Sequence, residues 1–241
     1  MVIIFFLMSH FAAVAQENVT TFGIQFKPML PLKFIGGEQE MVESENFNAI
    51  LSPRFGMNFG MVVRKGITKM WSFETGINLV QRNYSLNINH PDMPEDKTMN
   101  YRFICYEIPL QGMAYVKLGE QLYMNASGGF SFDMYPSNVE GFATARQDTN
   151  VFDYYQKTVR NGWLQYALLA NYGFEWRTKR NGYFYLGVSY HRPFRLIGIT
   201  FLEAKKNDDP AKLDFALKGD YLTIDLRYFF NEKPERKITK P

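Results

Sequence analysis

Residues 163–191 alternate between two kinds of side chain, and this alternation constrains the fold more than any other feature. From residue 164 to residue 177 every second side chain is apolar or aromatic, while most of the residues between them are small or polar. A period of two is typical of a strand whose two faces meet different surroundings. A tight polar turn at residues 178–182 separates this run from a second one at residues 183–191, so the pattern predicts a two-stranded hairpin.

The length of both limbs favours a membrane setting for this hairpin. Strands of soluble sheets usually have about five or six residues, whereas a tilted strand needs about nine to eleven residues to cross a bilayer. Each limb is long enough to cross a bilayer by this measure, and the apolar faces begin or end in Trp or Tyr. Such residues are typical of the level where a lipid-facing surface meets the headgroups.

The same alternation recurs along the chain, and the connections between the runs are alternately long and short. This asymmetry predicts an all-β fold, an eight-stranded antiparallel transmembrane β-barrel with long extracellular loops and short periplasmic turns. A soluble β-sandwich is the alternative, but its strands would be shorter and its loops would have no reason to alternate. The expected strands are residues 21–27, 53–64, 71–84, 102–117, 122–134, 164–177, 183–191 and 221–230.

The first residues are typical of a secretory signal peptide. An apolar run ends in the small residues Ala13-Val14-Ala15, although no Lys or Arg precedes it. The run is shorter than the roughly twenty residues that a spanning helix needs, which disfavours the alternative of a retained anchor. We therefore expect a signal peptide at residues 1–15, an outer-membrane barrel at residues 16–230 and a short periplasmic tail at residues 231–241.

Composition narrows the function classes. The formal net charge of +3 is too small to indicate nucleic-acid binding, and the single Cys105 excludes an intramolecular disulfide framework or a Cys-rich metal site. The mean hydropathy of −0.26 would suggest a soluble protein. Barrels give such values because lipid-facing and lumen-facing residues average out.

Four segments together resemble the PorT-like outer-membrane β-barrel family of Bacteroidota. They are the signal peptide before Gln16, the Glu-Ile-Pro-Leu segment at residues 107–110, the strand with Gly128-Gly129, and the closing Tyr-Leu-Thr-Ile-Asp-Leu-Arg-Tyr-Phe-Phe. The founding member of that family is an accessory component of the type IX secretion machinery. The resemblance therefore implies an outer-membrane barrel, with protein secretion as one concrete role.

The final strand also resembles the C-terminal signal that the barrel-insertion machinery reads, although a tail follows it here. The signal residues would be Leu226, Tyr228 and Phe230.

The inward positions of the expected strands carry acids and arginines. Such charges should pair in a narrow lumen, because an unpaired buried charge is costly. An eight-stranded barrel is just wide enough for side chains to fill, so a structural ion-pair plug is favoured over a diffusion pore, with a proton or ion path as the alternative. The expected lumen ion-pair network comprises Arg54, Glu74, Arg82, Glu107, Asp133, Glu175, Asp225 and Arg227; the expected membrane-interface aromatics are Trp71, Trp163, Trp176, Tyr190 and Tyr228.

Catalytic and metal-binding candidates are few. Ser189 and His191 share one strand face near the outer rim and superficially suggest a nucleophile and a base, but spacing identifies no orienting acid. His90 beside Asp92 lies in a loop, where we expect it to be solvated rather than a metal ligand. We therefore expect no cofactor, no metal and no catalysis.

Binding by the external loops is the third possibility. Aromatic residues in the third long loop could dock a partner, or they could pack within the loop. The residues are Phe142, Phe152, Tyr154 and Tyr155.

These observations favour a non-catalytic barrel of the bacterial outer membrane that acts as an accessory or scaffold component of an envelope complex. The alternatives are a free-standing barrel with surface-loop binding or a structural envelope role, and a lipid-modifying enzyme at the rim. The expected partners are outer-membrane lipid, envelope proteins and, during assembly, the insertion machinery.

Overall fold

The computed structural model describes residues 19–30, 39–93, 95–147, 149–178, 180–207 and 209–231. Within this part of the chain no helix is long and apolar enough to cross a membrane. The described residues contain thirteen strands: β1 Thr20–Leu30, β2 Glu40–Ser44, β3 Phe47–Gly66, β4 Trp71–Asn89, β5 Lys97–Lys117, β6 Leu122–Met134, β7 Val139–Gln147, β8 Asn150–Arg160, β9 Leu164–Arg177, β10 Tyr183–Pro193, β11 Gly198–Lys206, β12 Asp209–Leu217 and β13 Tyr221–Phe229.

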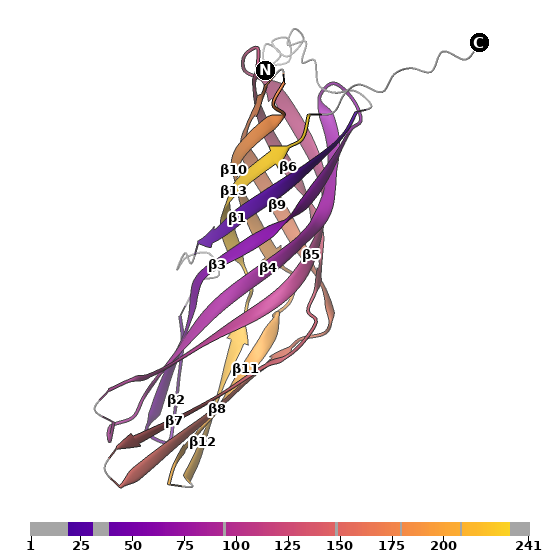
Figure 1. Ribbon diagram of the computed structural model, residues 1–241. Coiled ribbons are helices and arrows are strands. Elements are labelled where there is room, and N and C mark those ends of the chain that lie inside the picture. The colour runs from indigo at the N-terminus through magenta and orange to yellow at the C-terminus, as the bar shows by residue number, and fades with distance from the viewer. Residues whose placement is uncertain are drawn as a thin grey trace, which may run out of the picture.

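Eight of these strands pair in a closed circuit. The order is β1-β13-β10-β9-β6-β5-β4-β3, and β3 pairs again with β1, so the sheet returns to its first strand. Every pairing is antiparallel. Figure 1 shows the resulting cylinder at the upper end of the molecule, with the start of β1, the end of β13 and the short turns at its rim.

The all-β antiparallel architecture is therefore confirmed, but the number of strands is larger than the eight expected. The additional strands β2, β7, β8, β11 and β12 occupy the long connections that we expected to be loops. In addition, β3, β4 and β5 extend well past the expected ends of their runs. The expected signal peptide lies outside the described residues, as does all of the expected tail except Asn231.

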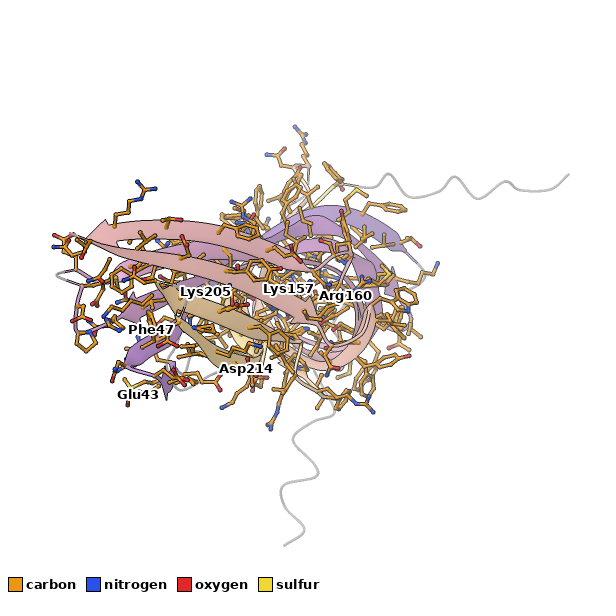
Figure 2. All side chains as sticks on the ribbon, turned by 90° about the horizontal axis from the view of Figure 1, so that it is seen from below. Glu43, Phe47, Lys157, Arg160, Lys205 and Asp214 are labelled. Atoms are coloured by element: carbon orange, nitrogen blue, oxygen red, sulfur yellow. The ribbon has the colours of Figure 1, made fainter. Side chains whose placement is uncertain are left out.

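The additional strands build a second body at the lower end of Figure 1. A four-stranded sheet, β12-β11-β8-β7, faces the extended ends of β3, β4 and β5, and β2 pairs with β3. We call this part the outer body. Figure 2 looks onto it from below, with Lys157 and Lys205 labelled on the four-stranded sheet and Glu43 and Phe47 on β2 and β3.

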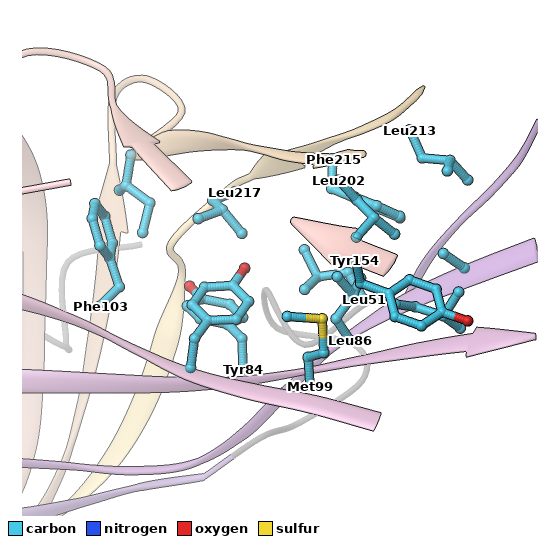
Figure 3. Packing of buried hydrophobic residues seen from close by; sticks show 14 of the residues in the cluster. Leu51, Tyr84, Leu86, Met99, Phe103, Tyr154, Leu202, Leu213, Phe215 and Leu217 are labelled. Atoms are coloured by element: carbon cyan, nitrogen blue, oxygen red, sulfur yellow. The ribbon is translucent and has the colours of Figure 1, made fainter. Parts of the chain in front are cut away.

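A continuous apolar core holds the outer body together. Phe47, Leu86, Phe152 and Phe215 are completely or almost completely buried in it, and they come from strands of both layers. Figure 3 shows side chains of the two layers meeting in this core, among them Leu51, Tyr84, Leu202 and Leu217. The outer body is therefore a packed two-layer structure and not a set of independent loops.

An apolar belt surrounds the closed sheet. Outward-facing side chains such as Ile77, Phe130 and Leu226 are exposed, while their neighbours along each strand point into the sheet and are buried. This exposed apolar surface is the reverse of what a water-soluble sheet shows. All five expected interface aromatics lie on the outward face: Trp71, Trp176 and Tyr228 near the short turns, and Trp163 and Tyr190 near the opposite edge of the belt.

Candidate functional site

Seven charged side chains inside the closed sheet form one paired series that alternates in sign. Glu74 lies at the centre of this set: its carboxylate pairs with Arg64, at 2.9 Å, and with Arg227. Arg64 also pairs with Glu175, and Arg227 pairs with Asp225 at 2.6 Å. Arg177 and Lys27 complete the two ends, at 2.6 Å from Glu175 and 3.4 Å from Asp225. We call this series the charge chain: Arg177, Glu175, Arg64, Glu74, Arg227, Asp225 and Lys27.

Aromatic rings form the walls around the arginines of the charge chain. The guanidinium of Arg64 lies 3.9 Å from the ring centroid of Phe229, and that of Arg177 lies 4.0 Å from the centroid of Tyr123. A desolvated guanidinium over an aromatic face is stabilised by the ring quadrupole. The charge chain is thus enclosed by aromatic rings, and each of its charges has a partner of opposite sign. Both features offset the cost of burying a charge.

A second cluster surrounds His191 further from the short turns. The imidazole is fully buried, and its Nε2 atom lies 2.8 Å from Asp133 Oδ2 and 3.6 Å from Glu107 Oε2. Its ring stacks on Tyr221 with 4.4 Å between centroids, and the Tyr221 hydroxyl donates to Glu107 at 2.6 Å. The guanidinium of buried Arg82 also lies over the Tyr221 ring, 5.0 Å from its centroid. We call these five residues the histidine cluster.

The geometry of the histidine cluster does not match that of a hydrolase. In a serine-type site one imidazole nitrogen contacts the acid and the other takes the proton of the nucleophile. Here Nε2 faces both Asp133 and the Ser131 hydroxyl, at 2.8 and 3.3 Å, while Nδ1 has no hydrogen-bond partner among the described residues. Ser189, which shares a strand face with His191 and superficially suggested a nucleophile, instead donates to Asp225 at 2.7 Å. The structure therefore does not join Ser189 and His191 into a dyad.

Metal binding is a separate possibility for the same cluster. Ligand atoms of Glu107, Asp133 and His191 lie within 4.8 Å of one another, and such oxygen and nitrogen donors bind ions such as zinc. All three side chains are already engaged with protein groups. Their arrangement is explained by this mutual pairing.

Seven of the eight expected lumen residues are buried in these two clusters, and one is not. Arg54 is exposed on the outside of β3, where its guanidinium donates to Asn100 Oδ1 at 2.8 Å. The prediction for Arg54 is wrong because the pairing of β3 with β4 shifts between Arg54 and Met57. A β-bulge at this point inserts a residue and reverses the inward and outward sides of the strand beyond it.

Sequence reasoning also missed four members of the interior. Lys27, Arg64 and Arg177 belong to the charge chain, and His191 is fully buried near the ends of β10 and β13 that lie away from the short turns. The alternation of inward and outward positions along a strand did indicate that Lys27 and Arg64 point inward, since both share a face with residues that were expected to point inward. Arg177 was hidden because it ends its strand beside a polar turn.

The expected loop residues divide between core and surface. Phe152 and Tyr154 are buried in the core of the outer body, whereas Phe142 and Tyr155 stack on its outer face, with 4.7 Å between ring centroids. His90 is also buried, so the expectation that it is solvated is wrong. Its ring packs against Phe47 and Phe152, with centroids at 4.6 and 5.3 Å.

Burial lowers the pKa of His90. Transfer away from water lowers the pKa of the imidazole, and the nearby Asp92 carboxylate opposes this only in part. The Nδ1 atom accepts a hydrogen bond from the backbone N–H of Asp92 at 3.1 Å, as a neutral imidazole can. The exposed Asp92 has a lowered pKa because Lys206 donates a hydrogen bond to its carboxylate.

Comparison with known proteins places this architecture in a family. A family model described as "Outer membrane protein beta-barrel domain" matches residues 20–196. Among solved structures, the outer membrane protein OprG from Pseudomonas aeruginosa has 11% identity and a TM-score of 0.49, with 90% of this chain and 98% of that chain covered. The outer membrane protease OmpT from Escherichia coli has 9% identity and a TM-score of 0.30, with 88% and 94% covered.

No curated protein matches the sequence significantly. The family match covers more than half of the chain and agrees with the closed antiparallel sheet and its apolar belt. The expected location in the bacterial outer membrane is thereby confirmed. The chain belongs to the family of the outer membrane protein β-barrel domain.

Proposed function

We propose that this protein is a non-catalytic, eight-stranded transmembrane barrel that serves as an accessory or scaffold component of an envelope complex. The closed circuit of eight strands would cross the membrane, with the short turns in the periplasm and the outer body at the cell surface. In this orientation the wall carries the apolar belt and the interior carries the charge chain.

One observation supports this role above others. The long connections between the barrel strands fold into a packed outer body, while paired side chains occupy the interior of the barrel. Seven mutually paired charges and the histidine cluster occupy the space inside the wall. A lumen packed in this way favours a structural part over a diffusion pore. A rigid body at the surface is a suitable platform on which a partner can dock.

Type IX protein secretion is the most specific form of this proposal, and it rests on the resemblance to the PorT-like family. Gentle detergent extraction of native membranes, affinity purification of this chain and mass spectrometry would test it. Stoichiometric envelope proteins are expected, and components of the secretion machinery would identify the complex. A lone barrel that changes its electrophoretic mobility on heating would contradict the accessory role.

A free-standing barrel with a surface-binding role is the second candidate, and the aromatic pair on the outer body favours it. Phe142 is 76% exposed, and with Tyr155 it lines a hollow of about 330 Å³. Exposed stacked aromatics are typical of binding surfaces. If this candidate holds, Phe142→Ala should abolish capture of a surface ligand by whole cells. Arg146→Ala, an exposed position on the same strand that does not line the hollow, should leave capture unchanged.

A further inference from the structure

The bulge in β3 places an arginine on the outside of the barrel. The register between β3 and β4 shifts between Arg54 and Met57, and Arg54 is exposed. Asn83 on β4 stabilises this geometry, because its side-chain amide donates to the Phe55 carbonyl at 2.8 Å. The outward position of Arg54 is thus built into the local backbone.

A second arginine lies level with Arg54 across the sheet, on the next strand but one. Arg54 pairs with Asn83 in the β3–β4 ladder, and Asn83 pairs with Arg102 in the β4–β5 ladder. Adjacent strands are about 4.8 Å apart, so the two arginines lie roughly 10 Å apart on either side of Asn83. We call Arg54, Asn83 and Arg102 the arginine row.

The arginine row lies where the apolar belt ends. Two rows closer to the short turns, the outward side chains are Phe59, Leu79 and Tyr106, which face the lipid level. One row further out, the pairing residues are Ser52, Ser85 and Asn100, which are all polar. The arginines therefore stand at the level where the belt meets the headgroups of the outer leaflet.

Among the described residues, no acidic side chain neutralises this row. The strands β3, β4 and β5 are completely described, and their only acids are Glu74 and Glu107, which both point into the interior. Neither Arg54 nor Arg102 forms an ion pair with a described residue; the side-chain partner of Arg54 is the Asn100 amide oxygen. The row and its neighbours line a hollow of about 430 Å³.

We propose that the arginine row binds the phosphorylated headgroup of a glycolipid of the outer leaflet. Guanidinium groups bind phosphate through paired charge-assisted hydrogen bonds, and two of them on one face can hold a phosphate between them. The acyl chains would lie against the belt below Phe55, and the sugar hydroxyls would meet the polar row above. This inference goes beyond the proposed accessory role, but it rests on the orientation proposed with it, in which the outer body lies at the cell surface.

The test is a binding measurement on the full-length barrel purified in detergent. Native mass spectrometry would follow titration with phosphorylated lipid A, with the same lipid after enzymatic removal of its phosphates, and with inorganic pyrophosphate. The variants are Arg54→Gln, Arg102→Gln and the pair together. Arg146→Gln is the matched control, because Arg146 is an exposed arginine on β7 of the outer body. Heat-dependent electrophoretic mobility verifies that each variant is folded.

Wild-type protein should bind phosphorylated lipid A, and each single substitution should weaken binding about tenfold, the usual effect of losing a charge-assisted hydrogen bond. The control should bind like the wild type, and removal of the lipid phosphates should have the same effect as the double substitution. Equal binding by the folded double variant would overturn the proposal. Two other results would also overturn it: equal affinity for pyrophosphate and phosphorylated lipid A, or equal affinity for the lipid with and without its phosphates. In either case the site would not recognise a phosphorylated lipid headgroup.

Discussion

The central position of Glu74 in the charge chain makes Glu74→Gln the most informative substitution. The change removes one negative charge and leaves the shape of the side chain. Arg64 then retains only Glu175 as an ion partner, and Arg227 retains only Asp225. The charge chain would then contain four cations and two anions, whereas the wild type contains four cations and three anions.

The expected loss of stability follows from the burial of these groups. Glu74, Arg64 and Arg227 are all at least 96% buried, so water can do little to solvate the cations that lose a partner. Removal of one member of a buried ion pair typically destabilises a protein by about 3–5 kcal/mol. With a urea dependence of about 2–3 kcal/mol per molar, the unfolding midpoint should fall by roughly 1–2 M.

The assay is urea unfolding of the barrel refolded into lipid vesicles, followed by tryptophan fluorescence. The double variant Glu74→Gln with Arg64→Gln should be more stable than Glu74→Gln alone, because it removes one of the two cations that lost an ion partner and leaves Glu175 paired with Arg177. Glu140→Gln is the control, since Glu140 pairs with Lys157 on the exposed surface and should not measurably change stability. A midpoint for Glu74→Gln equal to that of the control would refute a dry, mutually paired interior.

Three further predictions concern the wall, the outer body and its tip. In Gly129→Ala the added methyl would lie 2.0 Å from the Leu110 carbonyl oxygen, so the yield of folded barrel should fall sharply, while Gly112→Ala, with no atom within 4 Å, should fold normally. Phe215→Ala leaves a cavity in the core of the outer body and should cost it about 3–5 kcal/mol, seen as faster proteolysis of the outer body with the barrel intact. Because the pKa of His90 is lowered by burial, the stability that it contributes is complete above about pH 6.5 and is lost as the pH falls toward its folded value. The protection factors of the backbone amides at the β4–β5 tip, which are corrected for the intrinsic pH dependence of hydrogen exchange, should therefore be lower at pH 5.5 than at pH 7.5.

Each of these predictions has a clear contrary result. Equal folding yields for the two glycine variants would mean that the strands can move apart at Gly129. Simultaneous proteolysis of both parts in Phe215→Ala would mean that the outer body and the barrel unfold together. An unchanged pH response in His90→Phe would mean that another group controls the tip.

The membrane-facing strands could be predicted from the sequence because lipid on one side and a filled interior on the other enforce a strict period of two. The runs at residues 122–134 and 164–177 coincide with β6 and β9. The outer strands were missed because they lack such a contrast: the outward face of β8 includes both Tyr155 and Lys157. Composition alone does not distinguish such a strand from a polar loop.

The site was predicted in outline for the same reason. Parity placed Glu74, Glu175 and Asp225 in the interior, and the structure pairs them with cations there. Parity could not reveal the bulge at Arg54, because a bulge depends on pairing between two strands and leaves no clear mark in either. It also could not show that His191 meets Asp133 and Glu107, which lie on other strands.

The core of the outer body also limits the order in which the protein can be assembled. Its buried side chains extend along the chain from Phe47 to Leu217, and β12 is separated from the end of β13 by only a short stretch of sequence. In the proposed orientation, no portion of this core is complete until residues 209–217 have crossed the membrane. The last two strands to be delivered therefore complete both the wall, by bringing β13 to β1, and the outer body, by adding β12 to β11.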